Sequence, residues 1–187
     1  MIPMTEMTEE ILLSSQTNHI NKPLDLYFIS FGLNLTKHSY LYPDCDNYHK
    51  IHLVRINSKA IGFTVNDHIY FNIPEFENKH NESIQYLASL LISVYAHEST
   101  NHEIIDYKFI PPIKEVQSQL DKYYDKNNHA EETLPCYFSL ALLGCEKSAN
   151  KLYECGKGLL LNQYYTLRDN IIRNVERYSK KGRVYET

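Results

Sequence analysis

The feature that most constrains this chain is one long apolar helix that is interrupted by ionisable side chains. The predicted helix begins after Asn81 or Ser83, either of which can cap it, and runs to about Tyr107. Its apolar residues recur at helical spacing over a wide arc: Ile84, Leu87, Ala88, Leu90, Leu91, Ile92, Val94 and Tyr95. A helix of this kind is central in its fold. The segment His97-Glu98-Ser99-Thr100-Asn101-His102-Glu103 interrupts it, and because unpaired polar groups are costly to bury, these side chains need partners or a metal ion.

Two histidines and a glutamate on one helix are typical of a catalytic zinc site, in which a water molecule completes the coordination and the glutamate acts as general base. The usual spacing, HExxH, puts the histidines four residues apart, whereas His97 and His102 are five apart. On an ideal helix that separation is about 140°. A π-bulge would bring both imidazoles to one ion. The alternative pair at helical spacing is Glu98 with His102, which would hold a metal or form a hydrogen bond.

This motif carries a resemblance to known zinc peptidases. HExxxH resembles the zinc motif of the dipeptidyl peptidase III family. Residues 62–71 and the later Tyr95-Ala-His-Glu98 resemble, within about residues 50–105, a zincin-like domain of bacterial toxin and effector proteins. The resemblance implies that a strand lies along the cleft and that the helix supplies the metal ligands. Asn101 stands where that family has its second histidine, unless one inserted residue places His102 there.

A second apolar helix is expected to supply the third ligand. The segment from Glu131 to Leu143 resembles the corresponding helix of ImmA/IrrE-type peptidases, and this alignment puts Glu132 at the ligand position. Glu131 is the neighbouring candidate, and Pro135 requires a place in the first turn of that helix. His129 is a further candidate, as a ligand or as a donor to the transition state, and Tyr137 is an alternative donor.

The remaining pattern predicts a small sheet and a mainly helical C-terminal half. Residues 24–36 fit a helix or a strand, and residues 51–56 alternate as a strand. Residues 62–65 and 68–72 form a predicted hairpin around Asn66-Asp67. Further helices are expected over 114–124, 129–143, 147–161 and 162–180. We therefore predict an α+β, zincin-like fold in which a small antiparallel or mixed sheet packs on the central helix, as a single domain over 1–187 with a loose segment at 1–22.

Composition excludes several classes of function. The net charge of −4 argues against a nucleic-acid binder. The four cysteines include no CxxC pair, and nothing orients Cys136 with His129 as a thiol peptidase would need. The start lacks a Sec signal, and the longest apolar stretch is too short to span a bilayer. We expect a cytoplasmic protein, or an effector exported without a Sec signal, and we interpret Arg168, Arg173 and Arg177 as a solvated face.

These observations predict a zinc-dependent metallopeptidase, in the setting of a bacterial effector or toxin protease acting on a protein or peptide. His97, His102 and Glu132 would bind zinc, Glu98 would deprotonate the attacking water, and His129 or Tyr137 would stabilise the oxyanion. Residues 69–72 would bind substrate by β-addition. The alternatives are a catalytically inactive interaction or immunity-type protein on a zincin-like scaffold, and a metal-dependent hydrolase of a non-peptide substrate that uses Glu98 and His102.

Overall fold

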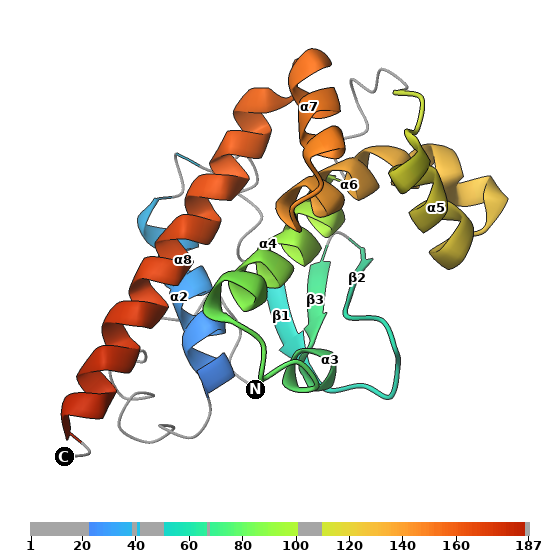
Figure 1. Ribbon diagram of the computed structural model, residues 1–187. Coiled ribbons are helices and arrows are strands. Elements are labelled where there is room, and N and C mark those ends of the chain that lie inside the picture. The colour runs from blue at the N-terminus through green and yellow to red at the C-terminus, as the bar shows by residue number, and fades with distance from the viewer. Residues whose placement is uncertain (1–22, 39–40, 42–50, 67, 101–109, 186–187) are drawn as a thin grey trace.

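A computed structural model describes residues 23–38, 41, 51–66, 68–100 and 110–185 of this chain (Figure 1). The predicted loose segment 1–22 and the motif residues Asn101, His102 and Glu103 lie outside the described residues. The elements, in chain order, are α2 (Pro23–Lys37), β1 (Ile51–Val54), β2 (Gly62–Val65), β3 (His68–Asn72), α3 (Ile73–Glu77), α4 (Ile84–Thr100), α5 (Lys114–Tyr123), the 3₁₀ helix η5 (Lys126–Asn128), α6 (His129–Leu142), α7 (Glu146–Glu154) and α8 (Gly158–Tyr185). The fold is mixed α+β and mostly helical, as predicted.

The sheet has three strands in the order β1-β3-β2 and is mixed. β2 and β3 form the predicted antiparallel hairpin, and Asn66 in its turn has a φ of 50°, which asparagine tolerates well. β1 pairs with β3 in parallel. β3 is therefore the central strand, with partners on both sides. The prediction that residues 69–72 bind substrate by β-addition is wrong, because both edges of that strand are already hydrogen bonded.

The end of β1 is set by a buried asparagine rather than by the alternating pattern. The predicted strand continues to Ile56, whereas β1 ends at Val54. The Ile56 amide donates to the side-chain oxygen of Asn72 at 3.1 Å, and the Asn72 amide donates to the backbone oxygens of Ser58 and Ala60. Asn72 has no exposed surface, so it satisfies the polar groups of this loop from inside the fold.

α4 occupies the centre of the molecule and packs against α6, α8, α2 and strands β2 and β3 (Figure 1). The hydroxyl of Ser83 accepts a hydrogen bond from the Tyr86 amide, which confirms the predicted N-cap. Edge-to-face aromatic pairs extend the core from α2 through α4 to α8: Phe31 contacts Tyr95, and Tyr95 contacts Tyr164. The apolar arc read from the sequence is thus covered on several sides, and α4 is regular to Thr100.

Two boundaries among the later helices differ from the prediction. α7 ends at Glu154 rather than near residue 161, because Gly156 has a φ of +77° and breaks the helix, after which α8 begins at Gly158. α6 begins at His129, so Pro135 lies inside it and not in its first turn. Proline cannot donate to the carbonyl of Glu131, one turn earlier, and the first turns of α6 therefore lack one backbone hydrogen bond.

Residues 24–36, which fitted a helix or a strand, form helix α2. Gly144, with a φ of +104°, follows the end of α6 as the predicted C-terminal glycine. Among the described helices, none combines the length and the apolar character that crossing a membrane requires.

Candidate functional site

The site begins with a contact between the two central helices. His97 lies near the end of α4, and its Nε2 atom is 2.8 Å from Oε2 of Glu132 in the first turns of α6. Both side chains are largely buried, with 12% and 17% of their surface exposed. Glu131, the neighbouring candidate, is exposed. The geometry thus brings His97 together with Glu132, two residues that lie 35 positions apart in the sequence.

A tyrosine completes the surroundings of His97. The hydroxyl of Tyr124, at the end of α5, lies 2.9 Å from the same Nε2 atom, and the two rings stack with an angle of 11° between their planes. Burial, followed by electrostatic repulsion from Glu132, Cys136 and Glu98, raises the pKa of Tyr124. Tyr124 therefore remains a protonated hydroxyl that can donate a hydrogen bond.

His97 Nε2 cannot donate to the Glu132 carboxylate and accept from the Tyr124 hydroxyl at the same time. Nε2 holds either a proton or a lone pair. A proton on Nε2 suits the Glu132 carboxylate and leaves the Tyr124 hydroxyl without its acceptor there. A lone pair on Nε2 accepts from Tyr124 but faces the carboxylate oxygen as a second acceptor. A cation at this point would satisfy the lone pairs of both the imidazole and the carboxylate.

The described residues fit a zinc ion in part. Neutral imidazole and carboxylate are ordinary zinc ligands, and two of them held by one tetrahedral ion lie roughly 3.3 Å apart, close to the 2.8 Å between His97 and Glu132. Within the described ranges, no group of three or more His, Cys, Asp or Glu side chains is arranged to hold a metal ion. The predicted third ligand, His102, lies outside those ranges, so the geometry offers two of the three predicted ligands.

Glu98 connects the end of α4 to the sheet through a hydrogen bond. Its Oε2 atom accepts a hydrogen bond of 2.6 Å from the hydroxyl of Thr64 on β2. β2 approaches α4 closely at Gly62, where an added Cβ would lie 2.3 Å from Cγ1 of Val94 and 3.8 Å from Cγ of Glu98. The absence of a side chain at Gly62 therefore lets the strand carry Thr64 to Glu98.

The two predicted oxyanion donors lie elsewhere in the network. Nε2 of His129 is 3.1 Å from the backbone oxygen of Tyr124, so His129 supports the segment that carries the Tyr124 ring. Tyr137 is fully buried; its hydroxyl donates to the backbone oxygen of Pro111 and accepts from the Ile113 amide. These bonds tie the segment before α5 to α6 and occupy the Tyr137 hydroxyl, which is therefore poorly placed to stabilise an oxyanion.

Cys136 does not provide a nucleophile. It is buried, and burial followed by the charge of Glu132 raises the pKa of its thiol to about 12. A thiol with so high a pKa carries almost no thiolate at neutral pH, which excludes it as an activated nucleophile.

Sequence reasoning missed two residues of this site, Tyr124 and Thr64. Thr64 had a usable signal, because alternation along the strand puts it on the same face as Gly62, toward the helix. Tyr124 had none, since the chain contains sixteen tyrosines and this one follows a solvated helix.

Comparisons of this chain with protein-family models, with curated proteins and with solved structures found no match.

Proposed function

We propose that this chain is a zinc-dependent peptidase, with a zincin-like site between α4 and α6. The observation that supports the proposal is the convergence of His97 and Glu132, two ordinary zinc ligands from different helices, on one largely buried point. Glu98 follows His97 directly, as the general base of a zincin does. The setting of a bacterial effector or toxin is part of the same proposal and depends on the resemblance in sequence.

His97, Glu132 and the third predicted ligand, His102, would hold the ion. Bound zinc supplies Lewis-acid polarisation of a peptide carbonyl and of a water molecule. Glu98 takes a proton from that water and passes it to the leaving amine, while the Thr64 hydroxyl fixes the position of its carboxylate. Tyr124 stays protonated and donates a hydrogen bond to the developing oxyanion. Tyr124 thus takes the role that was predicted for His129 or Tyr137.

Substrate would lie along β2 rather than along β3. In the described residues β2 is an edge strand, and its residue Thr64 already contacts Glu98. An extended peptide that adds to this edge would pass beside Glu98. This replaces β-addition at β3, which is central in the sheet.

The deciding experiment measures bound zinc and peptide cleavage in the same preparations. We expect about one equivalent of zinc in the purified protein and hydrolysis of members of a quenched fluorescent peptide library. Glu98→Gln should retain zinc and lose roughly 10²–10⁴-fold in rate. His97→Ala should lose both the zinc and the activity. Glu131→Gln removes the same charge from an exposed neighbour of Glu132 and should change neither.

A catalytically inactive scaffold is the second candidate, and one observation favours it. His97 and Glu132 contact each other at 2.8 Å, so they can act as a direct hydrogen-bonded pair that joins α4 to α6. In that case the protein binds no zinc when the ion is added in excess. His97→Ala then lowers the free energy of unfolding. Peptide cleavage is absent from the parent and from every variant. A zinc-loaded protein whose rate is unaffected by Glu98→Gln would also refute the proposed mechanism.

A further inference from the structure

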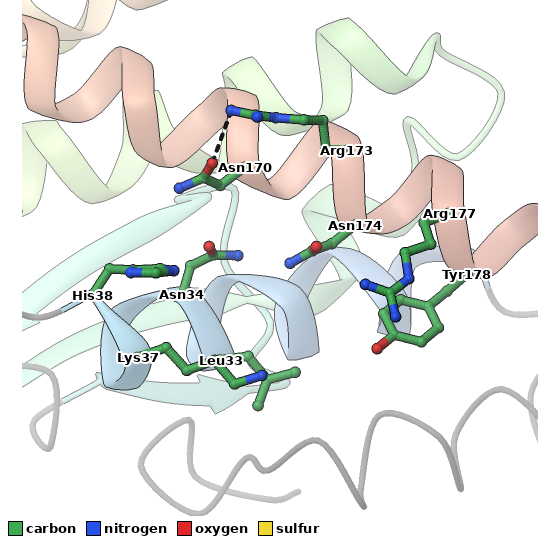
Figure 2. Close-up of a pocket in the computed structure, with 9 residues that line it drawn as sticks. All are labelled: Leu33, Asn34, Lys37, His38, Asn170, Arg173, Asn174, Arg177 and Tyr178. Atoms are coloured by element: carbon green, nitrogen blue, oxygen red, sulfur yellow. Dashed lines mark hydrogen bonds between the residues drawn. The ribbon is translucent and has the colours of Figure 1, made fainter.

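A polar cavity lies between α2 and α8, and it shares no residue with the candidate metal site. Its volume is about 240 Å³. Its lining includes side chains that could contact a ligand through nitrogen: Lys37, His38, Arg173, Asn174 and Arg177. Asn34 also lines it, but its side-chain nitrogen donates to the backbone oxygen of Ser30. Figure 2 shows Asn34 and His38 extending from α2 toward α8, and Asn174 extending from α8 toward α2. Side chains from two helices that are far apart in sequence thus surround one space.

The cavity is positively charged within an acidic protein. Lys37, Arg173 and Arg177 contribute three positive charges, and among the described residues no Asp or Glu lines the space. The whole chain has a net charge of −4. Cations gathered on such a surface repel one another, and a bound anion relieves that repulsion. Arg173 and Arg177 are exposed, as predicted for a solvated face, and they also line this cavity.

Donors remain for a ligand on the α8 side of the cavity. Arg173 donates one hydrogen bond from Nη2 to Asn170 (Figure 2). Its Nε makes a long contact of 3.5 Å with the Asp169 backbone oxygen. The guanidinium of Arg177 lies over the Tyr178 ring. Within the described residues, neither the Arg177 guanidinium nor the Asn174 amide makes a hydrogen bond. Figure 2 shows Arg177 and Asn174 on the side of α8 that faces α2, whereas the Arg173 guanidinium extends along α8 to Asn170. The Arg177 guanidinium and the Asn174 amide therefore present N–H donors to the cavity.

We propose that the α2/α8 cavity binds a small phosphate-bearing anion. Guanidinium groups match the oxygens of phosphate in charge and in geometry, and they are the side chains that proteins prefer for this purpose. The cavity is smaller than the roughly 300–1,000 Å³ of sites for drug-sized molecules, so the ligand is inorganic phosphate or a phosphate monoester with a small remainder.

Isothermal titration at constant ionic strength tests this inference with two probes, inorganic phosphate and glycerol phosphate. Saturable binding of either one supports the proposal. Tighter binding of the ester identifies a phosphorylated metabolite as the ligand class, and tighter binding of the free ion identifies phosphate itself. Arg177→Gln, and separately Asn174→Asp, should weaken binding roughly tenfold or more through loss of charged hydrogen bonds or added repulsion. Unchanged thermal midpoints will show that both variants fold.

The matched control is Arg168→Gln, which removes the same charge from the same helix. Arg168 pairs with Asp169 and lies over the Tyr165 ring, and it does not line the cavity. This variant should bind phosphate as the parent does. Equal weakening by Arg168→Gln would overturn the proposal, because it would show attraction to the general charge of α8. Absence of saturable binding at millimolar phosphate would also overturn it, as would a short single-stranded RNA that binds more tightly than either probe.

Discussion

At His97, one ring nitrogen meets two oxygens, those of the Tyr124 hydroxyl and the Glu132 carboxylate. In the proposed site this nitrogen binds zinc through its lone pair, so the Tyr124 hydroxyl competes with the ion for it. Once the lone pair is taken, the hydroxyl is available to a substrate oxygen. The same tyrosine is therefore expected to oppose metal binding slightly and to assist catalysis strongly.

Tyr124→Phe separates these two effects, because it removes the hydroxyl and keeps the stacked ring. We expect zinc affinity to stay equal or to increase, while kcat falls about 10²-fold through loss of one oxyanion donor. Zinc titration and steady-state kinetics on one preparation measure both quantities. Tyr123→Phe, at a neighbouring ring that is 61% exposed, is the control. Weaker zinc binding in Tyr124→Phe would instead show that the hydroxyl holds His97 in place as a ligand.

The sequence indicated that His97 and Glu132 belong to one site, but it did not indicate that the neutral side chain of Tyr124 joins them. His97 stands out because it interrupts an apolar helix, where an ionisable group is costly, and Glu132 because it is a carboxylate at the start of a second apolar helix. Tyr124 is as compatible with surface as with interior. Its contact with His97 depends on how α5 lies against α4 and α6, and hydrophobic periodicity carries no information about that orientation.

Among the elements, the contact of β2 with α4 is the one that joins the sheet to the candidate site. A methyl group at Gly62 would lie 2.3 Å from Cγ1 of Val94, a branched side chain with little freedom to move. We expect Gly62→Ala to lower the free energy of unfolding by about 1–3 kcal/mol, as overpacking does. Chemical denaturation measures the change. Combining Gly62→Ala with Val94→Ala should cost less than the two single changes added together. Simple additivity would show that the strand does not lie on Val94 in solution.

β1 and β3 carry a histidine pair that makes their pairing sensitive to pH. Nε2 of His52 lies 2.7 Å from Nδ1 of His68, and the His52 ring stacks on Tyr70. Burial, followed by the charge of His68, lowers the pKa of His52 below its ordinary value of 6.5. The folded protein thus favours neutral His52, and the unfolded chain binds a proton more readily. The stability that depends on neutral His52 is complete above pH 6.5 and is lost as the pH falls through the folded-state pKa.

His52→Phe tests this sign, since it keeps a stacking ring and removes the titrating nitrogen. Denaturant unfolding of parent and variant is compared at pH values above and below 6.5. We expect the parent to lose more stability than His52→Phe on acidification. His80→Gln, at an exposed histidine whose one hydrogen bond within the described residues is to the Glu77 backbone oxygen, should behave as the parent does. Parallel curves for parent and His52→Phe would contradict the prediction.

The helices and strands were largely predictable where residues close together in the sequence determine them. The hairpin followed from alternation and from Asn66, whose positive φ suits the turn. The parallel pairing of β1 with β3 was not predictable, because it joins strands through a long connection and leaves no local signal. The start of α8 was missed although Gly156 marked it, because the apolar periodicity continues on both sides of that glycine.

For the whole molecule, the sequence predicted that α4 is central but not what surrounds it. The width of the apolar arc on a helix indicates how much of its surface is buried. Which element packs on each side depends on the arrangement of the whole fold. α8 illustrates the difference. It lies along both α2 and α4, so Tyr164 reaches Tyr95 and the hydroxyl of Ser99, and its other residues enclose the α2/α8 cavity. The sequence of α8 alone predicts neither the contacts of Tyr164 nor the α2/α8 cavity.

The proposed zinc ion would join α4 to α6, two helices that pack together in the centre of the fold, so its binding should be measurable as stability of the whole chain. A ligand that binds only the folded state adds about 2.7 kcal/mol when its free concentration is 100 times the Kd. For a chain of this length we expect the thermal midpoint to rise by roughly 5–10 °C with zinc and to fall again with a chelator. Glu132→Ala should abolish the shift, because it removes the only proposed ligand that α6 contributes and leaves His97 and His102 as the remaining proposed ligands. His52→Phe should retain it, which separates the candidate site from the histidine pair on the sheet. A shift that survives Glu132→Ala and disappears in His52→Phe would place the zinc on the sheet and would leave α4 and α6 joined by a simple hydrogen bond.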